Sequence, residues 1–235
     1  HLAPHRGLRR LCAHIACRSI HLHADATDRM RPLAALHLAP LARHRLWRRC
    51  AAADVVCRAD GVIEPWQHRF GPMKLFDTSG AEPTAEEQKI GKIFCNRIEA
   101  QRAIDHMVEF VRRCDPPDSL RIGIITPYRA QIEVFHELLD SSASSSDLLH
   151  WLRPRTLVAT VDGFQGQEVD ILVISCVRDG GDSIGFLRDE RRLNVAITRA
   201  KQMCWIFGDF ETLTSNSRWE SLVRFAHGQR WLLNN

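Results

Sequence analysis

No apolar run in the 235-residue sequence approaches the roughly 18 residues that a membrane-spanning helix needs, so we expect no contact with a membrane. No two of the eight cysteines have the C-x-x-C spacing typical of zinc sites, and none has the regular spacing of a disulfide framework. Reduced thiols inside a cell are therefore favoured over a secreted scaffold, with nucleus and cytoplasm both open. The sequence begins with His and shows no signal-peptide layout, so we expect that its true start is missing.

Lysine is absent from the first 70 residues, which hold 12 arginines against 5 acidic residues. Residues 71–235 carry a net charge of −3, so the formal charge of +4 for the whole chain comes from the first segment. A compositional break of this kind predicts two parts. We expect a basic, His/Arg-rich leader over 1–70 and a single folded domain over 71–235.

Three interpretations of residues 1–70 stay open. The segment contains potential metal ligands, although their spacing matches no zinc motif. A basic arm would attract nucleic-acid phosphates whatever its fold. We favour an irregular, poorly ordered leader, because Leu, Ala, Arg, His and Pro follow one another there without a helical or strand period. The potential metal ligands are Cys12, His14, Cys17, His21, His23, Cys50 and Cys57.

From about residue 73 onward, β-branched apolar runs alternate with amphipathic helical patterns. Apolar side chains at Ile104, Met107 and Val111, for example, predict a helix that ends before the two prolines at 116 and 117. The alternation predicts an α/β domain with a mainly parallel sheet and helices on both faces. Ligands of such sheets bind outside the carboxyl ends of the strands. Strands are expected at 73–78, 121–128, 156–161, 169–177 and 203–208, further helices around 132–139, 193–197 and 219–227, and polar connections at 79–87 and 141–146.

Polar clusters flank these runs, and each one alone is ambiguous. The glycines of DGFQG (162–166) could be ordinary turn residues, and Arg97 could cap a helix or pair with Glu99. In their order and spacing, however, the clusters resemble the second RecA-like domain of superfamily 1 helicases of the up-frameshift, senataxin and immunoglobulin-mu-binding type. The resemblance covers about 73–227. It is carried by CNRIEA (95–100), TPYRAQ (126–131), TVDGFQGQEVD (160–170), SCVR (175–178) and SIGFLRDERRLNVAITRAK (183–201).

The resemblance implies ATP, with Mg²⁺, in a cleft between two RecA-like domains. Arg97 and Arg199 would be arginine fingers at the γ-phosphate, because phosphoryl transfer is catalysed mainly by well-placed cations. Gln165, Gly166 and Glu168 would contact the nucleotide, and Gly166 would let the backbone approach it closely.

The resemblance also implies single-stranded DNA or RNA as a partner, lying across the tips of the strands. Thr126, Tyr128, Thr160 and Asp162 occupy positions where the family contacts phosphate or sugar. Arg178 is either a further phosphate contact or a solvated loop residue. Contacts of this type hold the backbone without discriminating between bases, so binding should tolerate many sequences and depend on salt.

The sequence contains no G-x-x-x-x-G-K-[ST] motif, since Gly91-Lys92 precedes Ile and has no glycine five residues before it. We therefore expect the P-loop and the Mg²⁺ ligands on a first RecA-like domain missing from this chain, and no metal site here. The chain alone should then be inactive as an ATPase. Three functions stay open: the C-terminal motor domain of an ATP-dependent helicase, present as a fragment; a non-catalytic nucleic-acid-binding module; and a truncated remnant without function.

Overall fold

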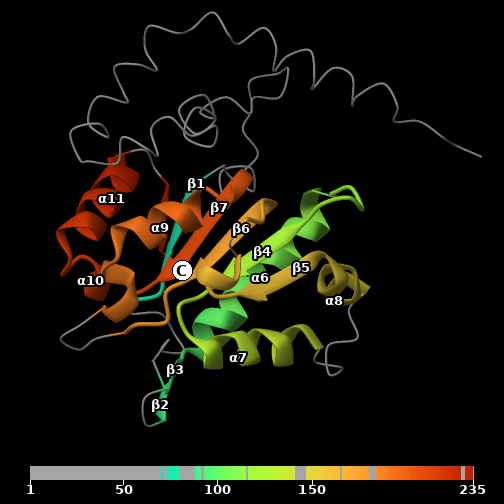
Figure 1. Ribbon diagram of the computed structural model, residues 1–235. Coiled ribbons are helices and arrows are strands. Elements are labelled where there is room, and N and C mark those ends of the chain that lie inside the picture. Colours follow the sequence, from blue (N-terminus) through green and yellow to red (C-terminus); the bar gives the residue numbers. More distant parts are fainter. Residues whose placement is uncertain are drawn as a thin grey trace, which may run out of the picture.

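The computed structural model describes most of the predicted domain and almost none of the predicted leader (Figure 1). The leader over 1–70, except Phe70, lies outside the described residues, and so do residues 80–87 and 141–146 of the predicted polar connections. The described residues are 70, 73–79, 88–90, 93–114, 116–140, 147–164, 166–179, 184–228 and 231–234.

A six-stranded sheet forms the centre of the described domain, and all of its pairings are parallel. Its strands lie in the order β5-β4-β6-β7-β1-β8, and β2 and β3 form a separate antiparallel pair. The predicted α/β class is thus confirmed. The strands are β1 (Met73–Asp77), β2 (Gln88–Ile90), β3 (Ile93–Cys95), β4 (Ile122–Ile125), β5 (Thr156–Ala159), β6 (Val169–Ser175), β7 (Ala200–Gly208) and β8 (Leu232–Asn234).

Helices cover both faces of the sheet, as predicted (Figure 1). The helices predicted through 104–111 and around 132–139, 193–197 and 219–227 correspond to α6, α7, α9 and α11. The α-helices are α6 (Arg97–Cys114), α7 (Arg129–Asp140), α8 (Asp147–Leu152), α9 (Glu190–Ile197), α10 (Phe210–Leu213) and α11 (Ser217–Gly228), and the 3-10 turns are η3 (Arg153–Arg155), η4 (Asp162–Phe164) and η5 (Gly185–Arg188).

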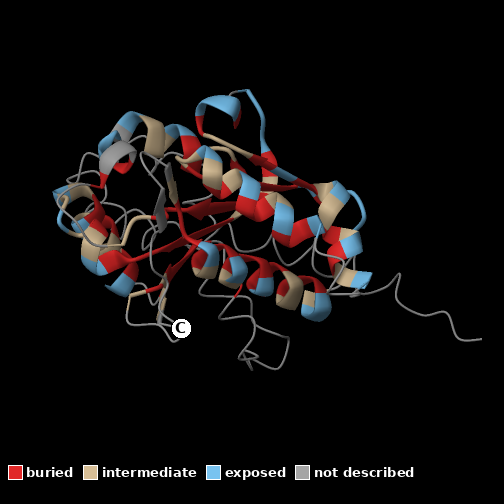
Figure 2. Ribbon diagram, turned by 90° about the horizontal axis from the view of Figure 1, so that it is seen from below, coloured by how far each residue is buried: buried red, intermediate tan, exposed pale blue. Residues whose placement is uncertain are grey.

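Side-chain alternation along the strands divides the core into two clusters. On β7, Cys204 and Ile206 point to the face covered by α9, α10 and α11, whereas Trp205 and Phe207 point to the face covered by α6, α7 and α8. The sheet is almost entirely buried between these layers, and the exposed residues lie on the outer faces of the helices (Figure 2). Such burial on both faces explains why the strands are nearly continuous apolar runs.

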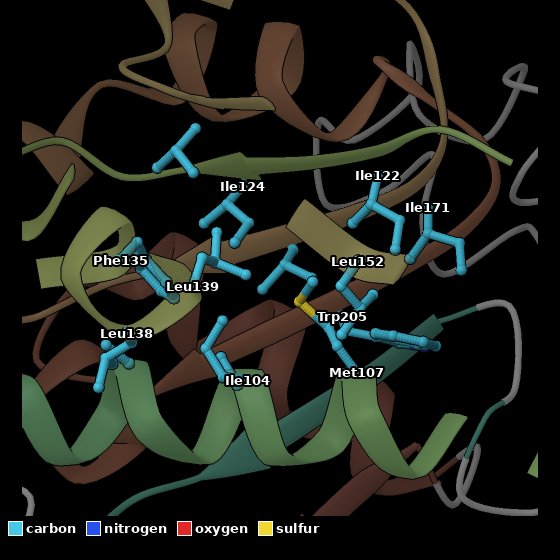
Figure 3. Packing of buried hydrophobic residues seen from close by; sticks show 14 of the residues in the cluster. Ile104, Met107, Ile122, Ile124, Phe135, Leu138, Leu139, Leu152, Ile171 and Trp205 are labelled. Atoms are coloured by element: carbon cyan, nitrogen blue, oxygen red, sulfur yellow. The ribbon is translucent and has the colours of Figure 1, made fainter. Parts of the chain in front are cut away.

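The cluster beneath α6, α7 and α8 is packed from both the sheet and the helices, whose side chains point toward one another (Figure 3). Trp205 is fully buried there and contributes one of the largest apolar surfaces of the core. The residues labelled in the figure are Ile104, Met107, Ile122, Ile124, Phe135, Leu138, Leu139, Leu152, Ile171 and Trp205.

Several strand ends differ from the prediction: β4 spans Ile122–Ile125 instead of 121–128, and β6 ends at Ser175 instead of at residue 177. Two further differences have a clear physical reason. β5 ends at Ala159 because the chain turns there toward η4, and Val161 packs into the core instead of continuing the ladder. β7 begins at Ala200, three residues before the apolar run that predicted it. Lys201 and Gln202 at the start of this strand are exposed and polar. The apolar run therefore could not show that they belong to the strand.

The connection between β5 and β6 crosses the sheet and carries the predicted motif at 160–170. Between the end of β5 and the start of β6 the chain passes over β4, where the ring of Phe164 packs against Gly123. A Cβ atom at Gly123 would lie 2.3 Å from the Phe164 ring, so this close approach requires glycine. The crossing carries the chain from one end of the strands to the other and separates residues 160–162 from 166–168.

Candidate nucleotide and nucleic-acid sites

The predicted site residues lie at two opposite ends of the parallel strands. Gly166 and Glu168 precede β6, and Arg199 precedes β7, where its carbonyl oxygen accepts a 3.0 Å hydrogen bond from Val169 at the start of β6. We call these three residues the amino-end group. Their shared position follows from the parallel register of β6 and β7.

The remaining candidates lie at the carboxyl ends of the strands. Thr126 and Tyr128 follow β4, Thr160 and Asp162 follow β5, and Arg178 follows β6. Arg97 belongs to this carboxyl-end group, because the Nδ2 atom of the preceding Asn96 lies 3.4 Å from the carbonyl oxygen of Val177, just past β6.

Arg97 and Arg199 are therefore not neighbours in this domain. β6 has 7 residues. At about 3.3 Å per residue, a strand of that length separates its two ends by roughly 20 Å. The two arginines also belong to opposite faces, since Arg97 begins α6 and Arg199 follows α9.

The amino-end group offers an open backbone and a cation. Gly166 has φ +82°, is exposed, and has no atom within 4 Å of the place where a Cβ would stand. Arg199 is half-buried, and its Nε donates a 3.1 Å hydrogen bond to the carbonyl oxygen of Val195 on α9. An uncovered glycine backbone and a guanidinium group at the same end of the strands fit a phosphate-bearing ligand. Glu168 is exposed at the same end, and Gln165 lies outside the described residues.

An ion-pair link ties α9 to the crossing that carries Asp162. The Asp189 carboxylate caps α9 by accepting hydrogen bonds from the amides of Arg191 and Arg192. The Arg192 guanidinium lies 3.6 Å from both Asp189 and Asp162, and all three side chains are substantially exposed. The link is therefore weak in energy, although it occupies the Asp162 carboxylate.

The two predicted threonine contacts differ in exposure. Thr126 is fully buried, and its hydroxyl has no hydrogen-bond partner within the described part of the chain. The Thr160 hydroxyl is half-buried and accepts a 3.2 Å hydrogen bond from the amide of Gly163, which closes the turn into η4. Thr126 therefore packs inside the domain at the carboxyl end of β4.

Tyr128 and Arg178 meet at a third residue that the sequence interpretation missed, Phe94 on β3. The Phe94 and Tyr128 ring centroids are 5.3 Å apart, and the Arg178 guanidinium lies 4.5 Å above the Phe94 ring. All three side chains are half-buried, so part of each is accessible. We call Phe94, Tyr128 and Arg178 the aromatic-arginine stack. Aromatic and guanidinium planes of this kind are the surfaces on which unpaired bases stack.

Arg97 is half-exposed and forms a 2.7 Å ion pair with Glu137 on α7. Both side chains are at least 50% exposed, so exchanging this partner for a phosphate costs little energy. Arg97 is thus available for a ligand, but from the carboxyl end of the sheet.

A buried polar network lies directly beneath the carboxyl-end group, and the sequence interpretation did not predict it. Gln131 donates from Nε2 to the Asn96 carbonyl (2.9 Å) and to the Ser175 hydroxyl (3.0 Å), and its Oε1 accepts from the Asn96 amide (2.7 Å). Ser175 in turn donates to the Glu99 carboxyl group. Burial raises the pKa of Glu99 from 4.5 to about 8, although hydrogen bonds from Ser175 and Val177 act in the opposite direction.

A signal for part of this network was present in the sequence. Asn96 and Glu99 have the N-x-x-E spacing of a helix start, and Asn96 Oδ1 accepts the Glu99 amide at 2.9 Å. Gln131 and Ser175 gave no signal, because single polar letters beside apolar runs do not reveal burial. The Arg97 partner Glu137 was equally hidden, since it depends on the packing of α6 against α7.

Within the described residues, no group of three or more His, Cys, Asp and Glu is placed to hold a metal ion. The described cysteines, Cys95, Cys114, Cys176 and Cys204, form no disulfide. None of the described helices is long and apolar enough to cross a membrane.

A family model described as an AAA domain matches residues 35–211. The match begins upstream of the boundary expected at residue 70, which stays a prediction.

Curated helicases resemble the chain over about two thirds to three quarters of its length. A regulator of nonsense transcripts 1 homolog of Drosophila melanogaster is 35% identical over 76% of this chain and 15% of its own length. Helicase sen1 of Schizosaccharomyces pombe is 38% identical over 66% of this chain and 9% of its own length. The ATP-dependent helicase NAM7 of Saccharomyces cerevisiae is 37% identical over 68% of this chain and 16% of its own length. The chain thus spans less than a fifth of each.

Proposed function

Because the chain belongs to the AAA-domain family of superfamily 1 helicases of the up-frameshift and Sen1 type, as a partial module of such a protein, we propose that it works as the C-terminal motor domain of an ATP-dependent DNA or RNA helicase. The observation that supports this most is the division of the candidate residues between the two ends of one parallel sheet. One end carries an open glycine backbone with an arginine, and the other carries an aromatic-arginine stack.

The amino-end group is the proposed nucleotide side. The chemistry supplied by bound ATP with Mg²⁺ is transfer of the γ-phosphoryl group. Gly166 and Gln165 would pass close to the nucleotide, Glu168 would accept hydrogen bonds from it, and Arg199 would bring a permanent positive charge. A guanidinium group suits this role because it is planar, multidentate and charged at every relevant pH.

We propose Arg97 as a second contact with phosphate. To make this contact, its guanidinium group must first break the ion pair with Glu137. Because it lies at the carboxyl end, roughly 20 Å from Arg199, the two arginines cannot meet at one γ-phosphate in this arrangement, and the proposed contact of Arg97 is with another phosphate. Because the Arg97–Glu137 pair is exposed, the exchange needs no unfolding of α6 or α7. Mg²⁺ ligands and the P-loop would be supplied by a first RecA-like domain.

The carboxyl-end group is the proposed binding surface for single-stranded DNA or RNA. The aromatic-arginine stack gives a cation and two aromatic faces, while Thr160 and Asp162 line the next strand end. Thr126 holds the edge in place from within. Cations and aromatic rings bind strands without strong base preference, so we propose sequence-tolerant binding.

Single-strand binding by the full chain tests this surface. Replacement of Arg178 by alanine should weaken binding of a fluorescent oligothymidylate or oligouridylate several-fold and reduce the salt slope by about one unit, because one phosphate contact is lost. Fluorescence anisotropy across a salt series measures both quantities.

The matched control is Arg224→Ala. Arg224 lies on α11, which packs against β1 and β8 at the other side of the sheet order, and it pairs with Glu220. Equal losses for Arg178→Ala and Arg224→Ala would mean that diffuse charge, and not this surface, binds the strand. No binding by the unmodified chain at low salt would contradict the proposed surface altogether.

A second candidate function is a non-catalytic nucleic-acid-binding module. It is favoured by the aromatic-arginine stack, a surface on which unpaired bases can stack without any nucleotide. The two functions differ in the role of Arg199. In a motor domain, ATP turnover would require Arg199. A binding module would hold single strands, and replacing Arg199 would change no ATP turnover even when the chain is joined to a P-loop domain.

A further inference from the structure

The turn after β6 contains an unusual backbone conformation. Val177 has φ +72°, and among the described residues other than glycine it alone has a positive φ. The amide of Arg178 donates a 2.8 Å hydrogen bond to the carbonyl oxygen of Cys176, which closes a three-residue turn around Val177. Positive φ at a β-branched residue is strained, and such strain persists only where the surroundings hold it.

Two side chains at the start of α6, those of Asn96 just before the helix and Glu99 in its first turn, hold both backbone groups of Val177. The Glu99 carboxyl oxygens lie 3.0 and 3.2 Å from the Val177 amide, and Asn96 Nδ2 lies 3.4 Å from the Val177 carbonyl oxygen. Glu99 is fully buried and Asn96 is 1% exposed, so water does not compete for these contacts.

Glu99 does not act as the usual partner of a helix cap. In a capping box, the acidic residue at this position accepts a hydrogen bond from the amide of the cap residue. Here Oε1 of Gln131 takes that role for Asn96, at 2.7 Å. The Glu99 carboxyl group is thereby released from the start of α6 and faces the end of β6, where it meets Ser175 and Val177.

The strained turn leads directly into the aromatic-arginine stack. Arg178 follows Val177 in the chain, and its guanidinium lies over Phe94, which is only two residues before Asn96. We call the contacts of Asn96 and Glu99 with Val177 the clamp. The clamp and the aromatic-arginine stack therefore join the same two segments, the start of α6 and the turn after β6. A change in φ at Val177 toward ordinary values would redirect Arg178 away from Phe94.

We propose that Glu99 and Asn96 are positioning residues that hold Val177 in its strained turn and so place Arg178 over Phe94 for contact with nucleic acid. The last step rests on the proposed function, whereas the clamp itself does not. The region thus has two roles: Arg97 faces a ligand, and its neighbours Asn96 and Glu99 shape the strand-binding surface from below.

A double-mutant cycle on the full chain tests the functional half. Glu99→Ala should weaken binding of a single-stranded oligonucleotide about as much as Arg178→Ala, and the double variant should be no weaker than either. Glu99→Gln keeps an oxygen acceptor for the Val177 amide and should bind nearly as well as the unmodified chain. Independent, multiplying losses for Glu99→Ala and Arg178→Ala would overturn the link.

A glycine substitution provides the rescue. Because glycine adopts positive φ without strain, Val177→Gly in the Glu99→Ala background should recover part of the lost affinity. A role of Glu99 in overall stability alone would not be rescued at this position. Absence of any recovery would count against the clamp.

Amide hydrogen exchange tests the clamp without nucleic acid. Exchange at the Val177 amide should be much faster in Glu99→Ala than in Glu99→Gln, while exchange at Val173 in the middle of β6 stays slow and shows that the sheet is intact. If Glu99→Ala does not fold, Asn96→Ala, which removes the contact with the Val177 carbonyl oxygen, should release φ at Val177 and weaken oligonucleotide binding instead. Unchanged Val177 exchange in the folded variant would overturn the clamp. Faster exchange in a chain that binds no oligonucleotide would uphold the clamp and reject the proposed function.

Discussion

Replacement of Arg199 by alanine is expected to lower ATP turnover about 10³- to 10⁵-fold when this domain is joined in one polypeptide to a RecA-like domain that carries a P-loop. The guanidinium would meet negative charge that builds up on the phosphoryl oxygens during transfer, and alanine leaves that charge uncompensated. Steady-state kcat with saturating ATP and single-stranded nucleic acid measures the loss.

Binding of nucleic acid should survive this substitution. Arg199 lies at the amino end of the strands, one length of β6 away from the proposed strand-binding surface. Arg199→Lys keeps the charge but loses the planar fork, so most of the loss should remain. Arg224→Ala is the control and should leave kcat unchanged. If affinity for the strand falls as much as turnover in Arg199→Ala, Arg199 contacts the nucleic acid instead.

The second large effect is a dependence of folding stability on pH that originates at Glu99. Burial holds its pKa at about 8 in the folded domain, against 4.5 for an ordinary glutamate. Between these two values the folded state binds more protons than the unfolded state, so stability falls as pH rises. Below about pH 4.5 and above about pH 8 this contribution is flat. Within the window, the free energy of unfolding should fall on the order of 1 kcal/mol per pH unit.

Glu99→Gln isolates this effect because glutamine does not titrate. The unfolding free energy of the unmodified chain minus that of Glu99→Gln, measured in urea at pH 5, 6.5 and 8, should decrease across the series. The negative charge of Asp209 favours the same direction, and the buried Cys176 thiol has a pKa well above this range, so it does not titrate in the window. Parallel curves for the two proteins would show that Glu99 has an ordinary pKa.

The sheet could be predicted from the sequence because its strands are buried on both faces and therefore apolar throughout. Ile171, Leu172 and Val173 form such a run, and each is completely buried. The hairpin of β2 and β3, the short α8 and the edge strand β8 could not be predicted. They are too short to show a period, and their positions depend on contacts with distant segments.

The candidate site was predicted as a set of residues but not as an arrangement. The motifs predicted Arg97 and Arg199 at the same γ-phosphate. The β5–β6 connection, which contains Phe164, and the course of α9 instead place Arg199 at the opposite end of the strands from Arg97. Nothing in the letters SCVR indicates that Val177 has positive φ or that Glu99 holds it. Such features arise from tertiary contacts between segments about 80 residues apart, which periodicity does not record.

ATPase activity of the purified chain, alone and joined in one polypeptide to a P-loop-bearing RecA-like domain, shows whether the chain holds a complete active site. We expect no turnover by the chain alone at any concentration of single-stranded nucleic acid. We also expect that turnover in the joined protein requires Arg199. Nucleic-acid-stimulated ATP hydrolysis by the chain alone would contradict the claim that it supplies only one side of a shared active site.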